Sequence, residues 1–355
     1  MISSLIIIAC ELLTLAVSLT APSASILQSR RLDTHLLPNR VIAQFPAGVW
    51  IENIAVRSNG NLLLTSFLPN ATLYEVSDLD CQTPTVTRLF TVDAITSFFG
   101  ITETSEDVFA VAGGNFSQSA GIGKGSSCLW RVDFTYGQPS YPELIATLPD
   151  AALLNGATTV PQKSHLVLVA DSILNVIWRV DMKQGRVDKA AQFLPERETS
   201  SAVNIGINGI HIHHGYLWFT NDTATANPVT GALETSMYRI KVDDNGGTAN
   251  GASAEKVLTL PSGAIDDFIY GPGERNVKWI AANKENKVFA ATPDGKYAVI
   301  AGASNSFEVA TATACKFGRT RADSHILYVS TGGGTINGTT EGGKVQAVDT
   351  TGFRV

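Results

Sequence analysis

The sequence of 355 residues predicts an all-β fold made of six similar units. The main observation is a short apolar motif, usually with an aromatic residue near its centre, that occurs six times and reads as a β-strand. Its copies are residues 73–76, 129–133, 177–181, 237–240, 288–291 and 345–349. Their centres lie 48 to 60 residues apart. Strand-type repeats at a spacing near fifty are typical of propeller blades, so we predict a six-bladed β-propeller.

A second motif supports this prediction, because several units continue into an apolar strand that ends in proline. These outer strands are residues 144–149, 190–195 and 257–261. A further copy, residues 41–46, precedes the first unit, and the last unit lacks an outer strand of its own. We therefore expect residues 41–45 to complete the last blade, which would pair two strand edges and close the ring.

The composition agrees with a single folded domain over residues 25–355. Hydrophobic residues make up 44% of the chain and charged residues 16%, which is enough for a large core, and the 31 glycines and 14 prolines suit many tight turns. The net charge is −6, and Arg30 and Arg31 form the only basic cluster. With a negative net charge and no larger basic patch, we do not expect the protein to bind nucleic acid.

The N-terminal segment differs from the rest and predicts a signal peptide over residues 1–24. Residues 2–10 and 12–19 are apolar, and small residues follow at Ala21, Ser23 and Ala24. The alternative is a membrane anchor, but Glu11 interrupts the apolar stretch, and a spanning helix needs about 20 apolar residues. We expect secretion, with no stable membrane insertion after the signal is removed.

Other features are compatible with export. Four Asn-x-Ser/Thr sites could carry glycans: Asn70, Asn115, Asn221 and Asn337. Cys81 follows one repeated strand and Cys128 precedes the next, so a disulfide between neighbouring blades is expected in an oxidising compartment. Cys315 is expected to be a buried free thiol.

Polar residues open the innermost strand of several predicted blades, and these openings converge on the central channel. The polar candidates for chemistry are Glu52, Asn155, Asn208, Asp222 and Asp266. Their oxygens could bind a hard cation such as Ca²⁺, or they could orient or protonate an organic ligand without a metal. The alternative is that they hydrogen-bond channel water.

Aromatic residues near predicted strand ends are candidates for an apolar wall around a ligand. They are Trp50, Phe67, Phe98, Phe99, Phe116 and Trp279. Aromatic residues also dominate protein interiors, so each could instead belong to the core.

Two local clusters suggest other chemistry only weakly. His211 and His213 would share one face of a strand, but no third zinc ligand follows at a recognisable spacing, so a turn at His214 and Gly215 is the better interpretation. Residues 332–334 are three glycines without the strand-loop-helix context of a phosphate loop. We expect a loop or bulge there.

The chain resembles the superfamily of senescence marker protein 30, gluconolactonases and related lactonases, in part through residues 170–172 and 177–181. In that superfamily, a glutamate, two asparagines and an aspartate at matching blade positions surround a divalent metal. Here those positions hold Glu52, Asn155, Asn208 and Asp266, so the resemblance implies that these four residues are the ligands if a metal is bound.

A closer resemblance is to a group of fungal propellers that includes the hetero-Diels-Alderases of tropolonic sesquiterpene biosynthesis. Residues 40–46, 50–57 and 60–65 carry it. It implies a pericyclase of secondary metabolism that acts on small apolar substrates without a required cofactor. A hydroxymethyl tropolone would lose water to give a quinone-methide-like heterodiene, which would add stereoselectively to a humulene-type sesquiterpene.

Such a reaction would require a large apolar cavity to hold the two reactants and polar groups to assist water loss. The alternatives are a metal-dependent lactonase or another hydrolase of the same superfamily, and a ligand-binding propeller without catalytic activity.

Overall fold

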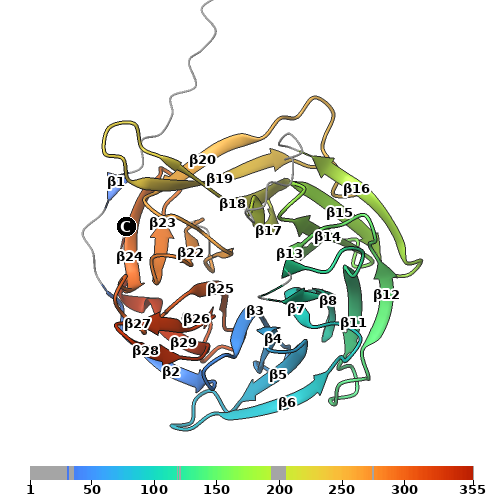
Figure 1. Cartoon of the computed structure of the whole chain (residues 1–355), viewed down its shortest axis with the longest axis horizontal. Helices are drawn as coiled ribbons and strands as arrows, with labels where there is room; N and C mark the ends of the chain where they lie inside the picture. The colour runs from blue at the N-terminus through green and yellow to red at the C-terminus, as the bar shows by residue number, and fades with distance from the viewer. Residues whose placement is uncertain are drawn as a thin grey trace, which may run out of the picture.

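The structure is a computed structural model that describes residues 30–31, 36–117, 119, 121–192, 205–273 and 276–354. The predicted signal peptide, residues 1–24, lies outside the described residues. Within these ranges the chain forms six antiparallel blades arranged around a central axis (Figure 1). The predicted all-β six-bladed propeller is therefore confirmed. No helix among the described residues has the length and apolar character needed to cross a membrane.

Each blade has four main strands, which follow one another outward from the axis in chain order, except that the outermost strand of blade 6 comes from the N-terminal side of the chain. Blade 1 comprises β3 (Trp50–Val56), β4 (Leu62–Leu68), β5 (Thr72–Ser77) and β6 (Thr85–Thr91). Blade 2 comprises β7 (Ser97–Ser105), β8 (Val108–Gly114), β11 (Cys128–Asp133) and β12 (Glu143–Thr147). Blade 3 comprises β13 (Leu154–Thr159), β14 (Leu166–Asp171), β15 (Val176–Asp181) and β16 (Arg186–Gln192).

The second half of the ring repeats this pattern. Blade 4 comprises β17 (Ile207–His213), β18 (Tyr216–Ala226), β19 (Leu233–Lys241) and β20 (Glu255–Leu260). Blade 5 comprises β21 (Phe268–Tyr270), β22 (Lys278–Ala282), β23 (Lys287–Ala291) and β24 (Lys296–Gly302), with β1 (Arg30–Arg31) pairing in parallel on β24. Blade 6 comprises β25 (Ala312–Phe317), β26 (Ile326–Thr331), β29 (Lys344–Asp349) and β2 (Asn39–Gln44).

Short elements lie on the loops. One ribbon pairs β9 (Phe116–Ser117) with β10 (Gly121–Ile122), and another pairs β27 (Gly334–Ile336) with β28 (Thr339–Glu341). A 3₁₀ turn, Thr350–Gly352, follows β29.

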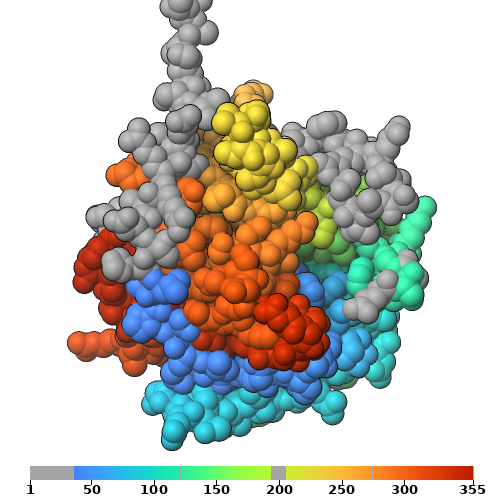
Figure 2. Space-filling view, turned by 60° about the vertical axis from the view of Figure 1, so that its left-hand side comes forward, coloured from blue at the N-terminus to red at the C-terminus, as the bar shows by residue number. Residues whose placement is uncertain are grey.

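The N-terminal strand closes the ring as predicted. β2 pairs antiparallel with β29, with Asn39 opposite Val348 and Gln44 opposite Lys344. In Figure 2 the blue residues near the start of the described chain lie against the red residues near its end. Each of the six repeated motifs is the third strand of a blade, namely β5, β11, β15, β19, β23 and β29.

The core is divided among the blade interfaces. In the described ranges there are six hydrophobic clusters, one between each pair of neighbouring blades. β11 shows how the repeated motif produces them. Leu129 packs toward blade 3, whereas Trp130 and Val132 pack toward blade 1, because alternate side chains of a strand point to opposite faces. The motif therefore encodes two interfaces at once.

Three glycines allow the innermost strands to approach one another closely. A Cβ on Gly100 would lie 2.3 Å from the Asn155 carbonyl oxygen, and one on Gly156 would lie 2.6 Å from the Asn208 carbonyl oxygen. At Gly209 a Cβ would lie 2.3 Å from Asp267 Oδ1. At this level of the channel, a side chain has no room between neighbouring inner strands.

The expected disulfide is wrong, because Cys81 and Cys128 are both free thiols. Cys81 is exposed in the turn after β5, whereas Cys128 is buried at the start of β11, where its Sγ accepts a hydrogen bond from Trp130 Nε1 at 3.1 Å. Equivalent strands of successive blades run in the same direction, so the end of one and the start of the next lie on opposite faces of the propeller. Cys315 is a buried free thiol, as expected.

A buried ionic cluster links blades 1 and 2. Arg57 is 4% exposed, and its guanidinium pairs with Glu75 at 2.6 Å and with Asp107 at 3.0 Å. It also lies 4.2 Å from the centre of the Phe134 ring. Loss of the arginine would leave two shielded carboxylates without a counter-charge.

We predict that Arg57→Ala lowers the free energy of unfolding by about 3 to 5 kcal/mol, the usual cost of removing one partner of a buried ion pair. The matched control is Arg131→Ala, which removes a more exposed arginine paired with Asp133 and should cost about 0 to 1 kcal/mol. Denaturant unfolding of both variants measures the difference, and equal losses would contradict the assigned role of the cluster.

Candidate active site

The starts of the inner strands bring most of the predicted polar residues together at one mouth of the channel. Glu52 lies on β3, Asn155 on β13 and Asn208 on β17. Asp266 lies two residues before β21, and Asp222 lies on β18. All five line one cavity of about 490 Å³. This volume is in the range of small-molecule sites.

One side of the cavity is aromatic, and Phe67 is at its centre. The Phe67 ring lies 5.7 Å from Trp50, 5.6 Å from Phe99 and 4.6 Å from Phe116, measured between ring centres. All four side chains line the cavity, as predicted. The cavity therefore combines an apolar wall with a polar floor.

The prediction for Trp279 is wrong. Its side chain is buried between blades 5 and 6, where it packs edge-on against Phe317 and Phe353. It lies on β22, the second strand of its blade, and faces the neighbouring blade rather than the channel. Phe98 likewise belongs to the core, between blades 1 and 2.

Each carboxyl at the mouth has a defined neutral hydrogen-bond donor. Trp50 Nε1 donates to Glu52 Oε2 at 2.6 Å, and Asn208 Nδ2 donates to Asp222 Oδ2 at 3.1 Å. The carboxylate of Asp266 accepts a hydrogen bond on Oδ2 from Asn283 Nδ2 at 3.0 Å. These contacts fix the orientation of the carboxyls.

Burial makes these carboxyls much weaker acids than usual. It raises the pKa of Glu52 to about 7, although the Trp50 hydrogen bond acts in the opposite direction. It also raises the pKa of Asp222 to about 7. Burial, together with the nearby charges of Glu52 and Asp222, raises the pKa of Asp266 well above its ordinary value. The site can therefore hold and release protons near neutral pH.

The sequence analysis missed Asn283 and Lys284, which also line the cavity. They occupy the turn between β22 and β23, and the charge of Lys284 lowers the pKa of Asp222 against the larger effect of burial. Turns between second and third strands lie on the same face as the starts of the first strands. The polar run at residues 283–286 could therefore have been placed at this mouth from the predicted topology.

The three glycines at residues 332–334 form a loop, as expected, and this loop supports the aromatic wall. A Cβ on Gly332 would lie 2.6 Å from Cδ2 of Trp50, so the glycine allows the indole to pack against the backbone. Gly333 has a φ of 73°, which glycine adopts without strain. The loop thus helps to place the indole that donates to Glu52.

The donors at the mouth are chemically suited to an oxygen-binding cation. Asn208 Oδ1 and Asp222 Oδ1 are shielded from solvent and have no hydrogen-bond partner among the described residues. Together with Glu52 and Asp266 they could offer oxygen ligands, and a cation would offset the repulsion between the carboxyls. Within the described ranges, no cluster of three or more His, Cys, Asp or Glu residues is arranged to hold a metal ion.

The histidine cluster has other partners. His211 Nε2 lies 2.9 Å from Asp267 Oδ1, and His213 Nε2 lies 3.0 Å from Asn276 Oδ1. His213 also stacks on Tyr270 with 3.8 Å between ring centres. The two histidines are thus engaged separately, and His214 lies at the expected turn.

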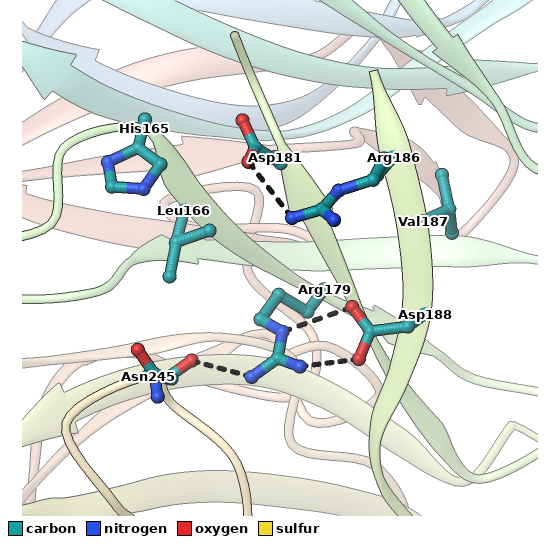
Figure 3. A pocket seen from close by; sticks show the side chains of 8 residues that line it. All are labelled: His165, Leu166, Arg179, Asp181, Arg186, Val187, Asp188 and Asn245. Carbon is teal, nitrogen blue, oxygen red and sulfur yellow. Dashed lines mark hydrogen bonds and ion pairs between the residues drawn. The ribbon is translucent and has the colours of Figure 1, made fainter. Parts of the chain in front are cut away.

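A polar hollow on the flank of blade 3 is a less suitable site (Figure 3). Arg179 makes two hydrogen bonds to Asp188, and Arg186 pairs with Asp181 at 3.8 Å. Both arginines are thus already neutralised by their neighbours. The central mouth combines apolar surface with titratable groups, and we assign the candidate site there.

Comparisons with known proteins identify the relatives of this chain. A protein of a Phoma species, named "Putative hetero-Diels-Alderase", is 32% identical over 324 residues, which cover 84% of this chain and 88% of the relative. A protein of Sarocladium schorii, named "Putative hetero-Diels-Alderase asR5", is 31% identical over 352 residues, which cover 89% of this chain and 84% of the relative. No family model matches the chain.

Solved structures confirm the fold. Regucalcin, a calcium-binding protein of Agrobacterium tumefaciens, superimposes with a TM-score of 0.59 at 17% identity and covers 90% of this chain and 97% of its own. A gluconolactonase of Xanthomonas campestris gives a TM-score of 0.56 at 13% identity, with 92% of each chain covered. At these identities the similarity is one of architecture, whereas the two sequence relatives carry the family. The chain belongs to the hetero-Diels-Alderase family and is an enzyme of pericyclase type.

Proposed function

We propose that the enzyme dehydrates a hydroxymethyl tropolone to a quinone-methide-like heterodiene and directs its stereoselective addition to a humulene-type sesquiterpene. The observation that carries this proposal is the pairing of an aromatic wall with titratable carboxyls in one cavity of about 490 Å³. The wall can hold two apolar reactants in register, and the carboxyls can move the protons that water loss requires. In this proposal the substrates are small and largely apolar.

Glu52 and Asp222 are suited to complementary roles. Because both have a pKa of about 7, one can be protonated while the other is ionised at neutral pH. In our proposal the protonated Glu52 donates to the departing hydroxyl, and the ionised Asp222 accepts the proton of the tropolone hydroxyl. Water leaves, and the heterodiene carries no net charge.

The neighbouring donors support this division. Trp50 Nε1 already points at Glu52 Oε2, so it stabilises the carboxylate that forms when Glu52 gives up its proton. The Asn155 carboxamide, at the same mouth, is suited to donate to the heterodiene oxygen and so polarise it for cycloaddition. New C–C and C–O bonds then form without further proton transfer. This mechanism requires no cofactor.

A second candidate function is a divalent-metal-dependent lactonase. The observation in its favour is a pair of oxygens, Asn208 Oδ1 and Asp222 Oδ1, that have no hydrogen-bond partner among the described residues and share the cavity with Glu52 and Asp266. A calcium ion held there would supply Lewis-acid activation of a lactone carbonyl. Hydrolysis of a lactone panel that depends on added Ca²⁺ and is abolished by a chelator would favour this function.

We also propose that the protein enters the secretory pathway through a signal peptide at residues 1–24. Exposed asparagines at Asn70 and Asn337 are accessible for glycans, and Asn115 is half-buried. Asn221 is only 6% exposed, which leaves no room for a glycan, so we do not expect modification there. The N-terminal sequence and glycopeptide masses of the secreted protein test these points.

Glu52→Gln should slow dehydration about 10²- to 10⁴-fold, the usual contribution of a general acid. Addition of a heterodiene generated chemically in the assay should keep its stereoselectivity, since the wall is unchanged. Rapid-quench measurement of water loss separates the two steps. Glu143→Gln is the control, because Glu143 is exposed on β12. Equal dehydration rates for the two variants would rule out the acid role.

Phe67→Ala should lower stereoselectivity and raise the KM for the terpene, because it opens the centre of the aromatic wall. Chiral chromatography of the adducts measures the first effect and initial rates measure the second. Phe90→Ala on the outer strand β6 is the matched control and should leave the isomer ratio unchanged. An unchanged ratio in Phe67→Ala would remove Phe67 from the substrate-binding surface.

The raised pKa of Glu52 also predicts a pH dependence of stability. The folded state favours the protonated form, so the contribution of Glu52 is fully present below its ordinary pKa of 4.5 and is lost as pH rises to about 7. Across this window the free energy of unfolding of the native protein should fall relative to Glu52→Gln by on the order of 3 kcal/mol. Denaturant unfolding of both proteins at pH 4.5 and pH 8 measures it. A constant difference would show that the carboxyl has an ordinary pKa.

A further inference from the structure

The opposite mouth of the channel contains a second cavity, which the proposed reaction does not use. The inner strands run from the active-site mouth toward this one, and their later residues line it. Its volume is about 350 Å³, enough for a small organic ligand. The wall is largely apolar, with Val56, Ile101, Ile269 and Phe317 among its residues.

Lys316 on β25 is the unusual residue of this cavity. Its side chain lines the cavity and is half-buried. In the part of the chain that the structure describes, its Nζ makes no hydrogen bond and no ion pair. Burial lowers the pKa of Lys316 and so increases the fraction of nucleophilic amine at neutral pH.

A histidine lines the same cavity as this amine, and an aspartate interacts with the amine electrostatically. His211 lines the cavity, and its Nε2 is 2.9 Å from Asp267 Oδ1. Asp267 is 4% exposed and also accepts a hydrogen bond from Asn53 Nδ2 at 3.2 Å, across the channel. Although burial acts against it, the charges of His211 and Lys316 lower the pKa of Asp267 below its ordinary value. Asp267 therefore attracts a positive nitrogen at residue 316 electrostatically.

The charges of the cavity favour a neutral ligand. The charge of Lys316 is opposed by the electrostatic effect of Asp267, and at the rim Arg319 pairs with Glu103 at 2.7 Å. A carboxylate ligand would add an uncompensated negative charge to this arrangement. A neutral carbonyl compound would not, and its apolar part matches the wall.

We propose that this second cavity binds small apolar aldehydes and holds them as an imine on Lys316. The amine nitrogen attacks the carbonyl carbon to form a C–N bond, and the carbonyl oxygen leaves as water with two hydrogens from the nitrogen. Starting from the ammonium form, the product is a protonated imine and one water, so no oxidant or reductant is needed. The imine nitrogen keeps its positive charge, which Asp267 stabilises electrostatically.

The test is reductive trapping on the native protein. Benzaldehyde and sodium cyanoborohydride are added near neutral pH, and peptide mass spectrometry follows the benzyl adduct on each lysine with time. We expect Lys316 to be labelled at least tenfold faster than Lys241, which is exposed on β19. Equal rates, or labelling of Lys316 only after denaturation, would overturn the proposal.

Two variants complete the test. Lys316→Arg keeps a positive charge at residue 316 and should abolish the fast phase, whereas Lys241→Arg should leave it unchanged. Circular dichroism and thermal unfolding confirm that each variant is folded before labelling. A fast phase that survives in folded Lys316→Arg would assign the reactive amine elsewhere and refute the proposal. Peptide mass spectrometry of the native protein tests the proposal even if a variant fails to fold, because it identifies the labelled lysine directly.

Discussion

The close approach of the inner strands around the channel axis is the constraint on which the rest of the structure depends. Gly100, Gly156 and Gly209 leave no room for a side chain between neighbouring blades. Hydroxyls near the channel then bridge the blades, since Thr65 on the second strand β4 donates to the Phe99 carbonyl at 2.7 Å and Thr313 on the inner strand β25 donates to the Ile51 carbonyl at 2.9 Å. The starts of the six inner strands are thereby brought into one small volume. The closely packed strands separate the acidic, aromatic mouth of the channel from the opposite mouth, which contains Lys316.

This convergence has an energetic cost that the fold must offset. Glu52 and Asp266 are each less than a tenth exposed, and a buried charge of the same sign nearby is unfavourable. Hydrophobic clusters at every described blade interface and the pairing of β2 with β29 provide the compensating stability. The unfavourable charges at the mouth can be tolerated because the ring around them is closed, with β2 and the last described strand, β29, paired in one blade.

The fold could be predicted from the sequence because each copy of the repeated motif supplies side chains to two blade interfaces. Trp130 and Leu129 pack to opposite sides of β11, so each copy of the motif is needed and the six copies made the blade count predictable. The extra outer-strand copy at residues 41–46 made the closing strand predictable. The mouth was also predictable in large part, since Glu52, Asn155 and Asn208 open equivalent strands. Trp279 was misplaced because periodicity alone does not say which buried face of a central strand an aromatic occupies. Cys81 and Cys128 were paired because they flank equivalent strands of neighbouring blades, although strand direction puts them on opposite faces.

The most direct test of the central claim is incubation of the purified protein, without residues 1–24, with a hydroxymethyl tropolone and humulene, in the presence and absence of a chelator. Chiral chromatography with mass spectrometry follows the adducts. Our account predicts that one stereoisomer forms in excess over the uncatalysed reaction and that the excess survives chelation. A product ratio equal to the uncatalysed one would contradict the proposed reaction of these substrates, and an excess lost on chelation would contradict its independence from metal.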